Sequence, residues 1–175
     1  QALEFYDTKG TIPMDDRFAI CNMVVEGGAK NGLFSPDQVT ENYLKERDGQ
    51  SGHWEISSRE DFHYAQELAI DLSSLKPKVA LPHSPAHVVD VEETKGEEIE
   101  QVFIGSCTGG RLRDLELTAS ILKKKKIALG IRLLITPASQ KIYQKAIENG
   151  YLQTILNAGG VVLNPSCGLC GGIDK

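Results

Sequence analysis

The sequence predicts an α/β fold with a mostly parallel sheet. Two observations in residues 99–165 lead to this prediction. Short apolar runs typical of strands alternate with longer amphipathic segments typical of helices, and glycine closes two of those segments. Such alternation favours a parallel sheet, because each helix returns the chain to the end of the sheet where the next strand must begin.

Length and composition are those of an ordinary globular protein. The 175 residues, 41% hydrophobic and 25% charged, fit one medium domain or two small ones. A net charge of −5 without a concentrated basic face makes nucleic acid a poor candidate partner. The apolar runs are too short to span a bilayer and no signal peptide is recognised, so we expect no membrane partner and a cytoplasmic location. Because the chain begins with Gln1 and ends soon after a cysteine motif, we interpret it as a fragment.

The first third of the chain carries two helix-like patterns. Apolar side chains in residues 14–33 recur at a spacing that predicts a largely buried helix. A second helix is predicted over residues 35–47, where Ser35 is a favourable N-cap and Pro36 suits the first helical position. The chain is therefore expected to begin with two helices.

The middle of the chain gives weaker patterns. Residues 48–58 predict a loop, because glycine and serine interrupt any periodicity there. Residues 58–72 fit either a helix or a mixed segment that ends in a strand. Three prolines and short apolar runs in residues 76–91 indicate extended segments and turns.

The acidic and polar residues 92–100 form the best candidate linker. We therefore expect a partial αβα domain over residues 1–92 and a second αβα domain, carrying the cysteine motifs, over residues 93–175. The second contains the clear alternation, with strands at 99–105, 131–137 and 161–165 and helices at 111–124, 138–150 and 151–160. The first of these helices is expected to turn inward Leu112, Leu115, Ile121 and Leu122.

Three of the four cysteines fall where a parallel sheet binds ligands. Cys107 follows the strand at 99–105, and Cys167 and Cys170 follow the strand at 161–165. Ligands bind beyond the carboxyl ends of parallel strands, so two loops at this edge can converge. The glycine-rich turn around Cys107 and the positive end of the next helix favour its thiolate form. Three thiolates meeting at one centre are therefore geometrically reasonable.

Several kinds of chemistry fit this set of thiols. Structural zinc takes four ligands and would need one more from Cys21 or a histidine. A redox Cys-x-x-Cys pair usually opens a helix, whereas Cys167 and Cys170 lie among proline and glycine. A [4Fe–4S] cluster on three thiolates leaves one iron open as a Lewis acid. Disulfides are disfavoured in a chain this poor in cysteine, and an inert, buried thiol is the favoured interpretation only for Cys21.

A resemblance to a known family runs in order along nearly the whole chain. IGSCTGGRLRDLELTASIL and GGVVLNPSCGLCGG are similar to the aconitase superfamily, and most of all to 3-isopropylmalate dehydratase large subunits and archaeal-type homoaconitases. AICNMVVEGGAKNGLFSPDQVTENYLKER resembles the family's Cys-Asn-Met…Glu-x-Gly-Ala segment, and LPHSPAHVVDV its link between domains. The resemblance implies part of a three-layer αβα, aconitase-like fold.

The resemblance also implies a site and a reaction. Family members carry a [4Fe–4S] cluster on three cysteines, and these match Cys107, Cys167 and Cys170. They move the hydroxyl of a hydroxy-acid to the neighbouring carbon through an alkene, while the open iron holds that hydroxyl and a carboxylate. Glu26 matches an active-site carboxylate and Asn22 a polar residue near the cluster. We expect both on one helix face, with Glu26 accepting or passing a proton, although by itself Glu26 reads as a surface charge.

Some features depart from the family or stay open. Gly109 stands where the family usually has Asn, and Arg111 fits either an anionic substrate or the surface. The family segments that precede Gln1 and follow the second cysteine pair are missing, as is the swivelling domain, which in the dehydratases is a separate small subunit. We therefore expect a small-subunit partner and a small hydroxy-acid substrate. We also expect this fragment to be inactive alone and to lack an ordered cluster.

The leading interpretation is part of an iron–sulfur hydro-lyase that interconverts 2- and 3-isopropylmalate in leucine biosynthesis. One alternative is the large subunit of a homoaconitase or a 2,3-dimethylmalate dehydratase, for which Gly109 would mark a different substrate. Another is a non-catalytic module that holds zinc or a regulatory cluster and binds RNA. The acidic balance of the chain disfavours RNA binding.

Overall fold

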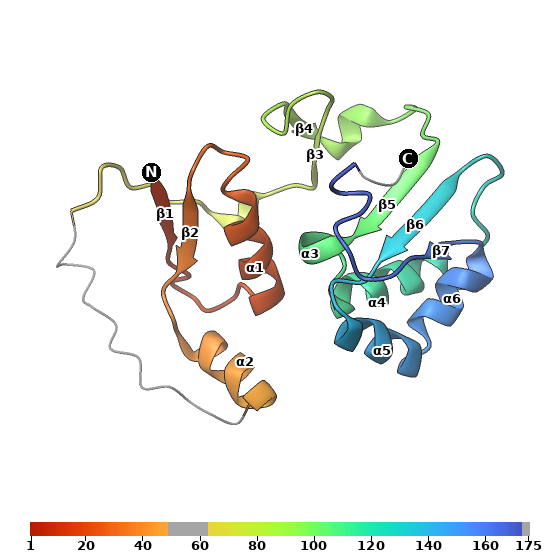
Figure 1. Cartoon of the computed structure of the whole chain (residues 1–175). Helices are drawn as coiled ribbons and strands as arrows, with labels where there is room; N and C mark the ends of the chain where they lie inside the picture. Colours follow the sequence, from red (N-terminus) through yellow and green to blue (C-terminus); the bar gives the residue numbers. More distant parts are fainter. Residues whose placement is uncertain (49–62, 173–175) are drawn as a thin grey trace. The chain divides into compact units, whose positions relative to one another are not determined.

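The structure is a computed structural model that describes residues 1–48 and 63–172 (Figure 1). It divides into two compact units, Gln1–Glu97 and Glu98–Lys175. This division falls inside the segment interpreted as a linker, while the predicted domain ranges themselves stay predictions. None of the helices in the described ranges has the length and apolar content needed to cross a membrane.

The first unit begins with a strand–helix–strand arrangement. β1 (Ala2–Phe5) pairs in parallel with β2 (Asn31–Phe34), and α1 (Met14–Met23) lies between them in the chain. Parallel neighbours require such a crossover, because the second strand must begin at the same end of the sheet. The rings of Phe5 and Phe34 stack across the pair with centroids 5.1 Å apart. This packing fixes the register of the two strands.

The rest of the first unit is a helix and a small antiparallel sheet. α2 (Gln38–Asp48) follows β2. Further along the chain, β3 (Lys78–Ala80) pairs antiparallel with β4 (Val88–Asp90), and the 3-10 helices η2 (Leu72–Ser74) and η3 (Val91–Thr94) flank this pair in sequence. The extended segments and turns predicted for residues 76–91 are therefore confirmed.

The helix predicted over residues 14–33 is wrong in its second half. α1 ends at Met23, and a turn follows in which the amide of Glu26 donates to the carbonyl oxygen of Met23 at 3.0 Å. Residues 31–34 then form β2. Helical periodicity could not reveal this, because the partner of β2 is a strand about thirty residues earlier in the chain, and such tertiary pairing overrides local propensity.

The helix predicted over residues 35–47 is confirmed, but its cap is Asp37 rather than Ser35. Asp37 Oδ1 accepts a hydrogen bond from the amide of Thr40 at 3.1 Å, which satisfies one of the open donors at the start of α2. Ser35 Oγ instead donates to Glu4 at 3.1 Å. The helix therefore begins later than predicted.

The segment before η2 differs from both forms predicted for it. The predicted loop at residues 48–58 lies, apart from its first residue, outside the described residues. In the described part of residues 58–72, the chain forms neither helix nor strand before η2, and Leu68 and Ile70 are exposed. The alternating apolar pattern therefore does not mark a paired strand here.

Arg17 holds the first unit together from a buried position, with 2% of its side chain exposed. Its Nη1 and Nη2 donate to the two carboxylate oxygens of Asp37 at 2.8 and 2.7 Å. Nη2 also donates to Asp7 at 3.1 Å, and Nε donates to the carbonyl oxygen of Ile12 at 2.9 Å. The guanidinium lies 5.1 Å from the ring centroid of Phe34. This Arg17 cluster joins α1, β2, the start of α2 and the segment after β1.

The Arg17 cluster makes the first unit sensitive to acid. The hydrogen bond from Arg17 holds the pKa of Asp37 below its ordinary value. Burial alone would raise the pKa of Asp7, but hydrogen bonds from three backbone amides and from Arg17 lower it overall. Because both folded-state pKa values are lowered, the carboxylates stabilise the unit fully above the unfolded-state pKa. That contribution is lost as the pH falls through the folded-state values.

We expect the first unit to lose stability as the pH is lowered from about 7 to about 3, mostly below about 4, where these carboxylates take up protons. Urea unfolding followed by circular dichroism at several pH values measures this. In an Asp37→Asn chain the midpoint should vary less with pH, because that carboxylate no longer titrates. An equal pH dependence in both chains would contradict the assignment.

The second unit is a three-stranded parallel sheet with a layer of helices. Its strand order is β5 (Gln101–Gly105), β6 (Arg132–Thr136) and β7 (Val161–Val162). The one-turn α3 (Ser106–Gly109) and α4 (Leu112–Leu122) connect β5 to β6, and α5 (Gln140–Glu148) and α6 (Tyr151–Ala158) connect β6 to β7. The predicted α/β fold with a mostly parallel sheet is therefore confirmed.

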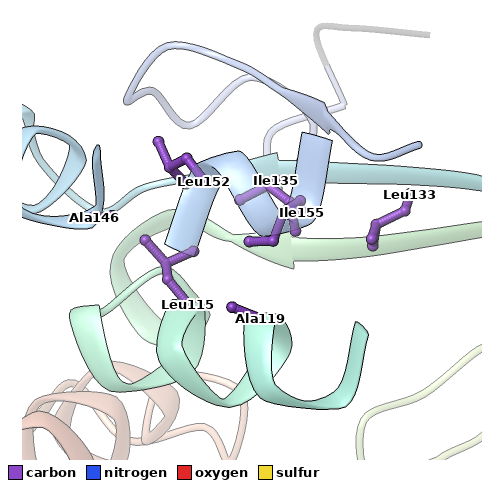
Figure 2. Packing of buried hydrophobic residues seen from close by; sticks show 7 residues of the cluster. All are labelled: Leu115, Ala119, Leu133, Ile135, Ala146, Leu152 and Ile155. Atoms are coloured by element: carbon purple, nitrogen blue, oxygen red, sulfur yellow. The ribbon is translucent and has the colours of Figure 1, made fainter. Parts of the chain in front are cut away.

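One apolar cluster joins the helices to the sheet (Figure 2). Leu133 and Ile135 of β6 are two residues apart and so share one face of the sheet. α4, α5 and α6 all contribute to the same cluster, whose buried members are Leu115, Ala119, Leu133, Ile135, Ala146, Leu152 and Ile155. Burial of each large aliphatic side chain contributes about 1.5–3 kcal/mol, so this cluster stabilises the packing of the helices on the sheet.

The ends of the helices in this unit follow the glycine signals. Gly150 and Gly159 have φ of +73° and +104°, the left-handed conformation in which glycine commonly ends a helix. The prediction that Ile121 of α4 turns inward is wrong, because 55% of this residue is exposed. Leu115 and Ala119 define the buried stripe, and Ile121 lies beside it.

Candidate functional site

The chain makes a sharp change of direction where β5 ends and Cys107 follows. Gly105 ends the strand, and Ser106 then adopts a left-handed conformation with φ +57° and is almost fully buried. Residues with a side chain seldom take this conformation unless the surroundings impose it. α3 starts at Ser106, which places Cys107 in a single helical turn directly beyond the carboxyl end of the strand, with its side chain exposed.

Two glycines let this turn lie against the end of β6. A Cβ atom at Gly105 would come within 2.7 Å of the carbonyl oxygen of Thr136, and one at Gly110 within 2.4 Å of the same atom. The amide of Ala138 donates to the carbonyl oxygen of Gly110 at 2.8 Å. A Cβ atom at Gly109, by contrast, would meet nothing within 4 Å. Gly105 and Gly110 are therefore required by backbone contact, whereas Gly109 is not.

The second cysteine motif lies in a turn that follows β7. The amide of Gly171 donates to the carbonyl oxygen of Cys167 at 2.6 Å, and the amide of Gly168 donates to Ser166 Oγ at 3.2 Å. These bonds fold the segment from Cys167 to Gly171 back on itself, and Cys167 and Cys170 are both exposed. Both cysteine motifs therefore follow strands of the same parallel sheet, at its carboxyl edge, as predicted.

An open cavity of about 540 Å³ has residues of both motifs in its lining. Cys170 lines it together with Ser106, Thr108 and Gly109 of α3, which flank Cys107 in the chain. The cavity continues along β5 and one side of α4, where its walls are Phe103, Ile104, Asp114, Leu117, Thr118 and Ile121. The cavity thus has apolar side chains from β5 and α4 and polar groups both in α3 and at Asp114 and Thr118 of α4.

The three thiols are available but not assembled. Cys107, Cys167 and Cys170 are exposed and free of disulfides. In the part of the chain that the structure describes, no three His, Cys, Asp or Glu side chains are grouped so that they could hold a metal ion. The arrangement therefore brings the motifs to one sheet edge without placing the sulfur atoms around a common centre.

The other predicted site residues have different positions. Asn22 lies in the last turn of α1 and Glu26 in the turn that follows it, and both are exposed. The expectation that these two share a helix face is wrong, because α1 ends between them. They belong to the first unit, whereas the cysteines belong to the second. Arg111 is the N-cap residue of α4, and its Nε donates to the carbonyl oxygen of Cys107 at 3.1 Å.

Sequence reasoning missed most of the cavity wall, including the polar residues Asp114 and Thr118. Asp114 Oδ2 accepts a hydrogen bond from the amide of Arg111 at 2.9 Å, and Thr118 Oγ1 donates to the carbonyl oxygen of Asp114 at 2.7 Å. An acidic residue three positions after the start of a helix is a recognisable capping signal. That signal could have identified Asp114, whereas the position of Thr118 depends on how α4 is rotated against the sheet.

Comparisons with known proteins identify a family for the chain. The model of the aconitase family (aconitate hydratase) matches residues 1–175. A 3-isopropylmalate dehydratase large subunit 2 of Archaeoglobus fulgidus is 42% identical over 176 residues, which cover 100% of this chain and 42% of the relative. A 3-isopropylmalate dehydratase large subunit of Lachnoclostridium phytofermentans is 47% identical over 159 residues, which cover 91% of this chain and 38% of the relative.

A third relative has a similar coverage. The 3-isopropylmalate dehydratase large subunit 2 of Rubrobacter xylanophilus is 45% identical over 171 residues, which cover 97% of this chain and 40% of the relative. The chain thus spans about two fifths of the length of the curated relatives it matches. Because the family model matches the chain from its first residue to its last, the chain belongs to the aconitase family.

Proposed function

We propose that this chain is part of the large subunit of a 3-isopropylmalate dehydratase, a hydro-lyase. The proposal rests on one observation above all: relatives 42–47% identical along 91–100% of the chain are named as that subunit. The names favour isopropylmalate over homoaconitate or dimethylmalate as the substrate. They also favour an enzyme over a non-catalytic module that holds zinc.

Cys107, Cys167 and Cys170 would hold the [4Fe–4S] cluster that the aconitase family implies. Thiolates are the ligands that iron–sulfur clusters take from proteins, and these three thiols are free and exposed. Cys170 and the residues on either side of Cys107 line one cavity, which supports a shared centre. When bound on three thiolates, the cluster supplies an iron with an open position that acts as a Lewis acid.

Glu26 and Asn22 are the residues to which we assign catalytic roles. Both side chains are exposed, so they are available to a ligand. A carboxylate such as Glu26 can accept a proton at its oxygen atoms and return it, whereas the Asn22 amide can donate and accept hydrogen bonds but does not titrate. We assign proton transfer to Glu26 and substrate orientation to Asn22.

The apolar part of the cavity suits a substrate with a hydrocarbon branch. Phe103, Ile104, Leu117 and Ile121 provide apolar side chains to its lining, and Ser106 and Thr108, next to Cys107 in the chain, provide hydroxyls. Such a wall would exclude water from an apolar group without orienting it. The name large subunit carried by the relatives also implies a small-subunit partner, which we propose for this chain.

Assembly of the complete large subunit with a small subunit tests this function. The complex should interconvert 2- and 3-isopropylmalate, and Glu26→Gln should lower kcat by about 10²–10⁴-fold, the usual contribution of general acid–base catalysis. Homoaconitate and dimethylmalate serve as competing substrates. Turnover of either of these, with none of isopropylmalate, would overturn the substrate assignment.

The cysteine assignment predicts a sharp contrast between two substitutions. Cys170→Ser should abolish the cluster formed by anaerobic reconstitution with iron and sulfide, because it removes a ligand. Cys21→Ser should not, because Cys21 lies half-buried in α1 of the first unit, where burial raises the pKa of its thiol. The broad visible absorbance of the reconstituted chains measures the difference. Equal absorbance in the two variants would contradict the ligand set.

A further inference from the structure

The carbonyl oxygen of Cys107 has an unusual hydrogen-bond partner. If α3 continued as a regular helix, this oxygen would accept from the amide four residues later, which belongs to Arg111. That amide instead donates to Asp114 Oδ2 at 2.9 Å, since Arg111 is the N-cap residue of α4. The Nε of the same residue donates to the Cys107 carbonyl oxygen at 3.1 Å. The side chain therefore replaces the main-chain bond that α4 has diverted.

The hydrogen bond from Arg111 Nε to the Cys107 carbonyl oxygen links α3 to α4 across Gly110. α3 is a single turn that begins with the left-handed Ser106, and its remaining helical bond runs from the amide of Gly110 to the carbonyl oxygen of Ser106 at 3.1 Å. A left-handed residue with a side chain costs of order 1–3 kcal/mol, so the turn persists only where its surroundings hold it. Arg111 is anchored at its backbone by Asp114 and reaches back to Cys107.

We propose that Arg111 is a positioning residue for Cys107 rather than a substrate-binding residue, which rests on the proposed role of Cys107 as a cluster ligand. The guanidinium fixes the main chain of Cys107 and with it the direction of the Cα–Cβ bond that carries the thiol. Arginine suits this task, because a charged donor makes a stronger hydrogen bond to a carbonyl oxygen than a neutral donor does. Of the two roles that the sequence left open, the hydrogen bond to Cys107 favours the positioning role.

The first arm of the test uses the cluster-free chain. In Arg111→Met, the amide of Gly110 should exchange with solvent roughly tenfold faster, as expected when one hydrogen bond that holds the turn is lost. Alkylation of Cys107 relative to Cys167, read from peptide masses, should change in the same variant. Arg111→Lys should restore part of the protection, because its ammonium group can also donate to the carbonyl oxygen. Arg113→Met, a change at an exposed position on the same helix, is the matched control.

The second arm uses the reconstituted large subunit with its small subunit. Arg111→Met should lose its visible absorbance to an iron chelator several-fold faster than the wild type and Arg113→Met, with KM for isopropylmalate unchanged. A raised KM with normal amide exchange and normal cluster retention would overturn the proposal and assign Arg111 to the substrate. If the wild type forms no cluster, the proposed function fails, whereas the exchange arm still decides whether Arg111 positions the Cys107 turn.

Discussion

Replacing Arg17 by methionine is expected to unfold the first unit locally or to destabilise it by about 3–5 kcal/mol, the usual effect of breaking a buried ion pair. The substitution keeps an unbranched apolar stem but leaves the carboxylate of Asp7, of which 4% is exposed, without its charged partner. It also removes the paired hydrogen bonds to Asp37. Amide exchange of α1 and α2 measures the loss in this unit alone.

Arg47→Met is the matched control for that experiment. Arg47 is an exposed arginine of α2 whose guanidinium lies 3.4 Å from the ring centroid of Tyr43, a contact worth about 0.5–1 kcal/mol at an exposed site. Arg17→Lys should fall between the two, because lysine keeps the charge but cannot bond both oxygens of Asp37 in a fork. Equal protection of α1 in the Arg17→Met and Arg47→Met chains would show that the Arg17 cluster does not hold the unit.

Replacing Gly110 by alanine is expected to have the largest effect in the second unit. The new Cβ atom would lie 2.4 Å from the carbonyl oxygen of Thr136 and 2.9 Å from the amide nitrogen of Ala138, so the backbone must move. Overpacking costs about 1–3 kcal/mol, and the hydrogen bond from Ala138 to Gly110, worth about 0.5–1.5 kcal/mol, would also be strained. Urea unfolding measures the sum.

Gly109→Ala is the control for the effect expected of Gly110→Ala. It adds the same atom one residue earlier, where the Cβ atom meets nothing within 4 Å, so the free energy of unfolding should change by no more than about 0.5 kcal/mol. Equal destabilisation by the two substitutions would contradict the close contact between α3 and β6.

The second unit could be predicted from its sequence because its signals are local. Alternating strands and helices, the glycines that follow α5 and α6, and the cysteines after β5 and β7 all act within a few residues of where they stand. Their consequence, a parallel sheet with both motifs at one edge, follows from a general rule of chain direction. The exposure of Ile121 was missed because it depends on how α4 is rotated against the sheet.

The first unit could be predicted only in part because its structure depends on distant partners. Residues 31–34 read as the end of a helix until β1 is known to lie beside them. Arg17 lies in α1, and its structural role can be recognised only once Asp7 and Asp37 are known to form ion pairs with it. Charge partners ten and twenty residues away leave no periodic trace in a sequence.

The candidate site could also be predicted only in part. The residue types and spacing of Cys107, Cys167 and Cys170 predicted a thiolate site at the carboxyl edge of the sheet, and the structure places both motifs there. The hydrogen bond from Arg111 Nε to Cys107 could not be predicted, because it depends on Asp114 diverting an amide that would otherwise continue α3. Side-chain substitution for a main-chain bond is a consequence of local geometry that residue type alone does not encode.

Iron and sulfide analysis of the anaerobically reconstituted large subunit tests the central claim most directly. If Cys107, Cys167 and Cys170 hold a [4Fe–4S] cluster, the wild-type protein should bind iron and acid-labile sulfide in equal amounts, and serine at any of the three positions should remove both. Stoichiometric zinc with no sulfide, retained after serine replaces Cys107, would contradict the claim.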